Sequence, residues 1–191
     1  LSGIAASDGI AIARAFRLET PVLDTAKKTV GDAGKEIERF AAARAEAVSE
    51  LEAIQKATAQ GISDKEAAIF GAHLLVLNDP ELVGPVNEKI ESELVNAEYA
   101  LKETADGFIA MFEAMENDYM KERAADIRDV TKRVTAHLLG VSIPDPSFIR
   151  EEVVIIAEDL TPSDTVQLNP QYVKGFITDI GGRTSHSAIL A

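Results

Sequence analysis

Residues 181–189, GGRTSHSAI, place a glycine pair, a basic side chain, two hydroxyls and a histidine directly before an apolar stretch. Paired glycines let the backbone turn without a Cβ clash, and Thr184 or Ser185 would cap a helix beginning near His186. Free N–H groups and the helix dipole attract anions there, so the pattern predicts a phosphate site with His186 as nucleophile. A loop that merely starts a helix, with His186 as a half-buried ring, explains the same residues.

The residues before this motif alternate between strand and helix patterns. The apolar run in 151–160, EEVVIIAEDL, is typical of a buried strand. A hydroxyl, a proline and an acid at 161–164 predict a short helix to about residue 168. Residues 173–178 then form a strand pattern that leads into the glycine pair. This order is that of an α/β fold.

Two further regions precede it. Residues 2–18 carry short aliphatic runs around a Ser-Asp-Gly turn, which predict strands joined by a turn. Apolar residues then recur at helical spacing in five successive segments, which predict an all-α bundle: 32–59, 63–78, 79–90, 96–115 and 118–139. We therefore expect an α/β plus all-α fold. A discontinuous α/β subdomain of residues 1–23 and 143–191 is interrupted by a helical subdomain of residues 24–142.

Composition narrows the function classes. The chain has 32 acidic and 19 basic residues and a formal net charge of −13, which argues against nucleic acid or anionic lipid as a partner. Cysteine is absent, and the three histidines are 64 and 49 residues apart (137 − 73, 186 − 137), so we predict no metal site. No leader or bilayer-length apolar run is present, and a cytoplasmic protein is expected. The start at Leu1 and the end at Ala191 suggest a fragment.

The chain resembles the Enzyme I family of the bacterial phosphoenolpyruvate-dependent sugar phosphotransferase system, in its N-terminal half, over essentially all 191 residues. The motifs that carry the resemblance are SGIAASDGIAIARA, KEAAIFGAHLLVLNDPEL, YMKERAADIRDVTKR, DLTPSDTVQLN and GFITDIGGRTSHSAI. The last motif is shared with pyruvate phosphate dikinase and phosphoenolpyruvate synthase. The long helical insert with KERAAD is what resembles Enzyme I, where that part docks the carrier protein HPr.

The resemblance implies a site around His186, which would take the phosphoryl group from phosphoenolpyruvate and pass it to a histidine of HPr. Thr165 matches a family threonine whose hydroxyl hydrogen-bonds the active histidine, although an ordinary helix hydroxyl is the alternative. Arg183 is expected to support the phosphate, or else to be an exposed loop base. The remaining residues of the expected phosphate loop are Gly181, Gly182, Thr184 and Ser185.

The resemblance also implies an HPr-docking surface on the helical subdomain. The positions that match it are taken as a cluster, because helix stripes are mainly core: Ala68, His73, Leu75, Asp79, Glu81, Leu82 and Arg123. Glu66 stands where the family often has a basic residue, so individual charge contacts are not carried over. His137 is assigned no function.

In the resembled family, phosphoenolpyruvate and Mg²⁺ bind in a C-terminal barrel that also forms the homodimer. This chain alone is therefore not expected to use phosphoenolpyruvate, and its α/β sheet is expected to be incomplete, with an unpaired edge. Two other hypotheses remain: a non-catalytic helical interaction module, and the swivelling phosphohistidine domain of a dikinase-like or synthase-like enzyme. The second is disfavoured because no nucleotide-binding motif is present.

Overall fold

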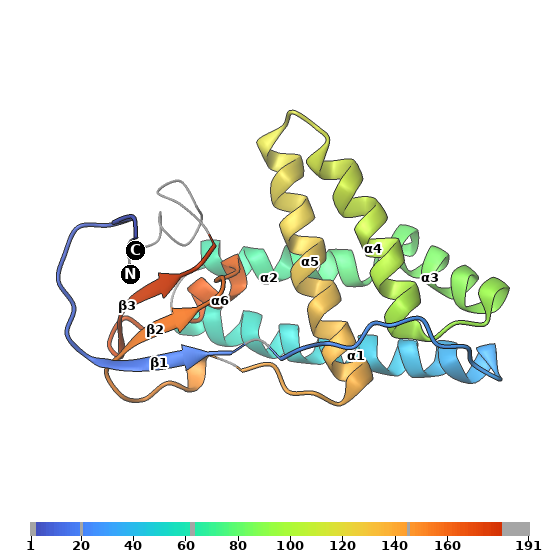
Figure 1. Ribbon diagram of the computed structural model, residues 1–191, viewed down its shortest axis with the longest axis horizontal. Helices are drawn as coiled ribbons and strands as arrows, with labels where there is room; N and C mark the ends of the chain where they lie inside the picture. Colours follow the sequence, from blue (N-terminus) through green and yellow to red (C-terminus); the bar gives the residue numbers. More distant parts are fainter. Residues whose placement is uncertain (1–2, 20, 62–63, 145, 181–191) are drawn as a thin grey trace. The chain divides into compact units, whose positions relative to one another are not determined.

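The computed structural model describes residues 3–19, 21–61, 64–144 and 146–180, which divide into two units (Figure 1). One unit is helical and spans Val22–Ser142. The other combines Leu1–Pro21 with Ile143–Ala191 and contains a small sheet. The helical unit is therefore inserted between the first strand and the rest of the sheet. The described chain confirms the predicted combination of an α/β part with a helical bundle.

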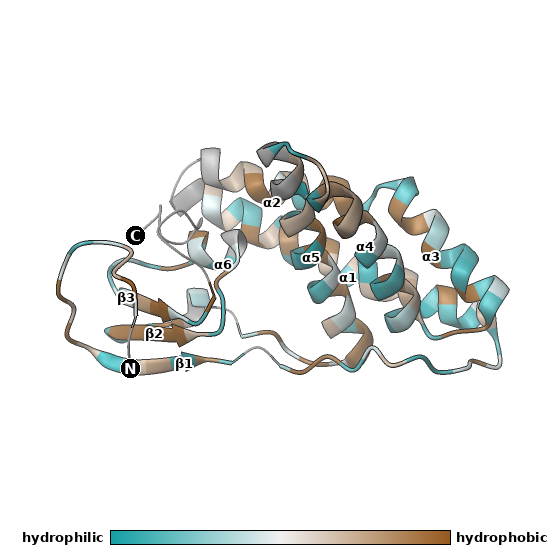
Figure 2. Cartoon of the chain, turned by 45° about the horizontal axis from the view of Figure 1, so that its top comes forward, coloured by the Kyte–Doolittle hydropathy of each residue, from teal (hydrophilic) through white to brown (hydrophobic). Residues whose placement is uncertain are grey.

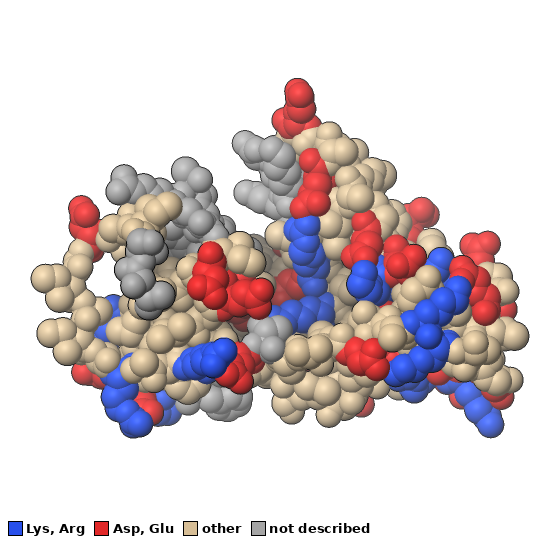
Figure 3. Space-filling model, viewed as in Figure 1, with Lys and Arg blue, Asp and Glu red and all other residues tan. Residues whose placement is uncertain are grey.

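Five helices form the helical unit, in the order expected from the periodicity: α1 (Ala33–Gly61), α2 (Asp64–Leu77), α3 (Pro80–Glu93), α4 (Ala97–Glu113) and α5 (Asp118–Leu139). On α1, Phe40, Ala47 and Leu51 are buried at the predicted spacing. α5 packs against α1, α2 and α4, and α3 packs against α4. Acidic and basic side chains are interspersed over the visible face of this unit (Figure 3).

Local signals set the helix ends. Asp79 caps α3, where its carboxylate accepts from the Glu81 N–H, and Pro80 is the first helical residue. Leu94 ends α3 in the left-handed region at φ 52. Gly140 follows α5 at φ 64, a conformation that favours glycine. Ser63, followed three residues later by Glu66, also predicts a capping box for α2, but this box lies outside what the structure describes.

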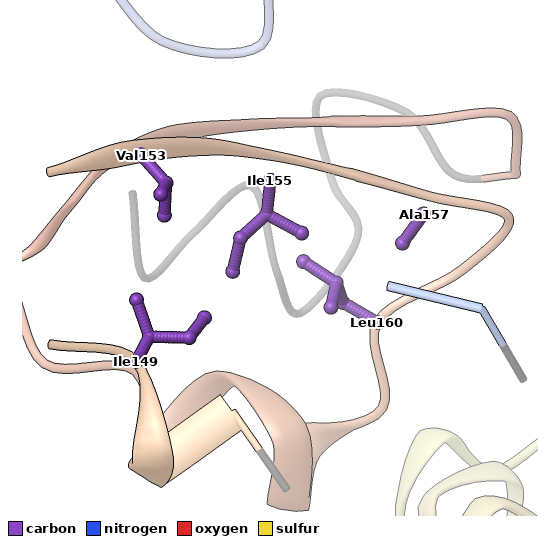
Figure 4. Packing of buried hydrophobic residues seen from close by; sticks show 5 residues of the cluster. All are labelled: Ile149, Val153, Ile155, Ala157 and Leu160. Carbon is purple, nitrogen blue, oxygen red and sulfur yellow. The ribbon is translucent and has the colours of Figure 1, made fainter. Parts of the chain in front are cut away.

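Three parallel strands form the sheet, in the order β1 (Arg14–Leu18), β2 (Val153–Ala157) and β3 (Val173–Thr178). Between β2 and β3 lies the short helix α6 (Pro162–Val166), and a 3₁₀ turn, η1 (Pro146–Phe148), precedes β2. β2 is apolar along its length (Figure 2). On one face, Val153 and Ile155 point toward Ile149 and Leu160, which lie on the segments that cover the sheet (Figure 4).

The opposite face of the sheet is partly open. Ile156 and Ile177 are register partners on this face, and both are exposed. Parallel sheets are normally covered on both faces. The described residues therefore leave an apolar strip beside β2 and β3.

The expectation of two strands within residues 2–18 was wrong for most of that stretch. Residues 3–13 form no strand, and the alternating Ile10 and Ile12 are 95% and 90% exposed. β1 pairs with β2 only from Arg14 to Leu18, because β2 itself is five residues long. Alternation without a neighbouring strand provides no ladder of hydrogen bonds.

Candidate functional site

The carboxyl edge of the parallel sheet brings the ends of β2 and β3 together. The Ile180 N–H donates to the Glu158 carbonyl at 2.9 Å, and the Asp179 N–H donates to the same carbonyl at 3.1 Å. Residue 181, where the glycine pair begins, follows this anchor directly. Ligands of open parallel sheets bind outside the carboxyl ends of the strands, and Ile180, the last described residue before the motif, lies at that edge.

The helix α6 begins at the same edge, because it follows β2 by only a short loop. A capping box fixes its start: the Asp164 N–H donates to Thr161 Oγ1 at 3.2 Å, and the Thr161 N–H donates to Asp164 Oδ2 at 3.0 Å. Thr165 is buried on this helix, and its hydroxyl donates to the Thr161 carbonyl at 3.3 Å. The Thr165 side chain is thus held on a rigid, capped turn.

The predicted residues of the phosphate loop lie outside the described part of the chain: Gly181, Gly182, Arg183, Thr184, Ser185 and His186. Of the residues predicted for the phosphoryl site, the structure therefore describes Thr165. What it adds is the position of the chain that enters the loop.

In the helical unit, two of the predicted docking residues, His73 and Arg123, both contact Asp126, which was not predicted. His73 is 1% exposed, and its Nε2 lies 3.2 Å from Asp126 Oδ1. The other oxygen of Asp126 lies 3.8 Å from Nη1 of Arg123. Because a carboxylate only accepts hydrogen bonds, the Asp126 contact places a proton on Nε2. Sequence reasoning missed Asp126, although its spacing of three residues from Arg123 on one helix was a visible signal.

The second ring nitrogen of His73 faces another acid. Nδ1 lies 3.8 Å from Asp129 Oδ2 and has no hydrogen-bond partner among the described residues. The Phe70 ring packs edge-on against the imidazole, with centroids 6.1 Å apart. His73 is therefore a core residue of the helical unit in this chain. Asp126 connects it to the partly exposed side chain of Arg123.

The other predicted docking residues divide by exposure. Ala68, Leu75, Asp79 and Glu81 are exposed, and Leu75 most clearly so, at 70%. Leu82 is buried on α3 and contributes to the core. The exposed members lie on α2 and at the start of α3, so the part of the cluster that a partner could reach spans the α2–α3 turn.

His137, to which no function is assigned, lies beside two acidic side chains. Its Nδ1 lies 3.2 Å from Glu46 Oε2, and its Nε2 lies 2.8 Å from Glu50 Oε2. Both acids belong to α1, so the ring joins α5 to α1.

The described ranges contain neither a cluster of metal ligands nor a membrane-spanning helix. Within residues 3–19, 21–61, 64–144 and 146–180, no group of three or more His, Asp or Glu side chains could hold a metal ion. In the same ranges, no helix is long and apolar enough to cross a membrane.

The sequence matches two families of PEP-utilising enzymes. Residues 2–123 match the family described as "PEP-utilising enzyme, N-terminal", and residues 149–191 match "PEP-utilising enzyme, mobile domain". Proteins named phosphoenolpyruvate-protein phosphotransferase are 70% identical in Geobacillus stearothermophilus, 69% in Bacillus sp. (strain S) and 63% in Bacillus subtilis (strain 168). Each of these matches covers the whole chain. The chain spans about a third of the length of these relatives.

Solved structures agree with this assignment. A solution structure of Enzyme I is 40% identical, with a TM-score of 0.86 over 98% of this chain and 77% of that one. The N-terminal domain of the nitrogen Enzyme I is 27% identical, with a TM-score of 0.68 over 97% of this chain and 76% of that one. The chain therefore belongs to the PEP-utilising enzymes and, within them, to the N-terminal part of Enzyme I.

Proposed function

We propose that this chain carries a phosphoryl group on His186, taken from phosphoenolpyruvate and passed to a histidine of HPr. The observation that supports the proposal most directly is the anchor between Ile180 and Glu158. It holds the entry to GGRTSHSAI at the carboxyl edge of the sheet, where the capped helix of Thr165 also begins. The names of the chain-wide relatives describe the same reaction class.

The proposed reaction needs two displacements at phosphorus. In the first, an imidazole nitrogen of His186 forms a P–N bond as the P–O bond to the enolpyruvate oxygen breaks, and the enolate leaves and takes a proton. In the second, a nitrogen of the HPr histidine attacks, and the P–N bond to His186 breaks. Arg183 would support the charged phosphate, and Thr165 would orient the ring.

The parts of the full reaction that this chain would not supply lie in the remaining length of the relatives. There we expect the phosphoenolpyruvate site, its Mg²⁺ and the dimer contact. We assign HPr docking to the helical unit, over the exposed residues of the α2–α3 turn and the Arg123–Asp126–His73 chain behind them. The α/β unit is assigned the phosphohistidine.

Phosphate transfer tests the first assignment. HPr of Bacillus subtilis, phosphorylated beforehand on its histidine and separated from the phosphotransferase that phosphorylated it, is mixed with the chain, and peptide mass spectrometry locates the phosphate. We expect one acid-labile phosphate on His186 that is absent in His186→Ala. His137→Gln is the matched control, because His137 is a second histidine whose ring contacts only structural acids, and it is expected to keep the transfer.

Each other outcome has a defined meaning. Phosphate on His73 or His137 would show that His186 is not the nucleophile. Protection of the β3 amides from hydrogen exchange would show that the sheet is folded. If such a chain takes no phosphate, the phosphohistidine proposal is wrong. If HPr still binds that chain, the interaction-module hypothesis stands in its place.

A binding measurement tests the docking surface separately. Leu75→Asp places a charge on the exposed centre of the α2–α3 surface, and we expect the Kd for HPr to rise about tenfold or more. Val22→Asp is the control, because Val22 is 95% exposed in the same unit and outside the proposed surface. Equal affinities of the two variants in titration calorimetry would move the docking site elsewhere.

A further inference from the structure

A charge cluster with a buried carboxylate, Glu98, and a partly exposed guanidinium, Arg39, joins α1, α4 and α5. Arg39 on α1 forms two parallel hydrogen bonds to Glu98 on α4, Nη1 to Oε1 and Nη2 to Oε2, both at 2.8 Å. Its Nη1 also donates to the Leu138 carbonyl near the end of α5, at 2.9 Å. Glu98 is only 5% exposed. Bidentate guanidinium–carboxylate pairs fix orientation as well as distance.

Asn96 extends this cluster to a segment far away in sequence. Its Oδ1 accepts from the Lys28 N–H at 2.8 Å, and its Nδ2 donates to the Ala26 carbonyl at 3.2 Å. The same Nδ2 also donates to Glu98 Oε2 at 3.0 Å. Asn96 precedes α4, but its side chain makes no cap hydrogen bond to that helix. Its polar atoms therefore serve residues 26–28 and Glu98.

Backbone hydrogen bonds continue the contact along residues 28–30. The Asn96 N–H donates to the Lys28 carbonyl at 3.0 Å, and the Val30 N–H donates to the Leu94 carbonyl at 2.8 Å. Thr29 and Val95 form an antiparallel bridge between these bonds. Residues 26–30 are thus attached to the rest of the helical unit through an isolated bridge and its flanking hydrogen bonds, although they precede its first helix.

The residues joined by these hydrogen bonds lie near the two ends of the helical unit, where the chain enters it and where it leaves. Residues 26–30 lead into the helical unit from the boundary at Pro21 and Val22, and Leu138 lies just before the chain leaves it at Ser142 and Ile143. A continuous series of hydrogen bonds connects the entry segment to the exit segment. It runs from Ala26 and Lys28 to Asn96, then to Glu98 and Arg39, and ends at the Leu138 carbonyl.

We propose that Asn96, Glu98 and Arg39 act as a clamp that locks the entry and exit segments of the helical unit into one rigid piece. Residues 26–30 and the end of α5 then move together with the helices of this unit rather than separately from them. A merely stabilising cluster would make the unit harder to unfold. The clamp makes the more specific claim that residues 26–30 do not detach on their own while the helices stay folded.

Hydrogen exchange of the chain tests the clamp through Asn96→Ala. Because this variant removes two hydrogen bonds to the entry segment without removing a helix cap, we expect exchange in residues 26–30 to rise about tenfold. Amides in the core of α5, used as internal reference, are expected to stay unchanged. Val130→Ala, a buried α5 variant away from the clamp, is expected to speed exchange in α5 at least as much as in residues 26–30.

A reversible disulfide cross-link provides a second test of the clamp. Thr29 and Val95 face each other without a mutual hydrogen bond, the antiparallel position with the closest Cα atoms. The chain has no cysteine, so a Thr29→Cys/Val95→Cys pair forms one defined disulfide. Added to Asn96→Ala, it is expected to restore protection of residues 26–30 when oxidised and to lose it when reduced.

Three results would overturn the clamp. These are unchanged exchange of residues 26–30 in Asn96→Ala, fast exchange of that segment already in the wild-type chain, and equal acceleration of α5. Should Asn96→Ala not fold, Asn96→Asp is measured in the same way, because it keeps the side-chain shape and loses both N–H donors.

Discussion

Glu98 is a charged residue in the interior of the helical unit, and its partners account for that. Burial raises the pKa of the Glu98 carboxyl, but hydrogen bonds from Arg39 and Asn96 outweigh burial, and the net shift is downward. The same contact with Glu98, followed by the one with Glu36, raises the pKa of Arg39. Removing the Glu98 charge leaves Arg39 paired with Glu36 alone, whereas removing Arg39 would leave the buried Glu98 carboxylate without its cation.

The residue-scale prediction is that Glu98→Gln destabilises the helical unit in a pH-dependent way. A carboxyl whose pKa is lower in the folded chain stabilises above its unfolded pKa, and this stabilisation is lost as the pH falls through the folded value. We expect Glu98→Gln to lower the unfolding free energy by about 2 kcal/mol at pH 7 and by less toward pH 3. Urea unfolding followed by circular dichroism measures both. A deficit that stays constant over this range would contradict the charged pair.

At the scale of elements, α6 is a helix of five residues that depends on its cap. The reciprocal bonds between Thr161 and Asp164 satisfy two N–H groups that so short a helix cannot satisfy internally. The helix carries Thr165, the described residue that we assign to the phosphoryl site. The cap therefore stabilises the helix on which the proposed transfer depends.

We predict that Thr161→Ala loosens α6, whereas Thr161→Ser leaves it nearly unchanged. The loss of an N-cap hydroxyl lowers stability by about 1 kcal/mol, so exchange of the amides in residues 162–168 is expected to rise about fivefold in the alanine variant. The serine variant keeps the hydroxyl and is the matched control. Indistinguishable exchange in the two variants would show that the hydroxyl does not hold the helix.

For the whole molecule, periodicity and punctuation predicted most of the fold. The five helices, β2, β3 and the cap at Thr161 follow from local residue spacing, and the structure confirms them. Residues 3–13 were misread because alternation does not say whether a partner strand exists. Within the sheet, only the five residues of β2 meet β1.

The contacts that escaped prediction, in the candidate docking surface and in the clamp, join residues that are distant in the sequence. Asn96 reaches Lys28 across 68 positions, and His73 reaches Asp126 across 53. The exposures of Leu82 and His73 likewise follow from packing between helices, which one helix pattern cannot reveal. The role of His186 and the docking surface remain predictions that rest on family resemblance and the experiments above.

The parallel pairing of β1 with β2 also has a consequence for biosynthesis. Arg14 pairs with Val153, which the ribosome adds 139 residues later (153 − 14). At about 5 to 20 residues per second, β1 waits roughly 7 to 28 s for its partner. Helical contacts are more local and form faster, so the inserted bundle is the part of the nascent chain that can fold first. The sheet then forms after the helical unit has already folded.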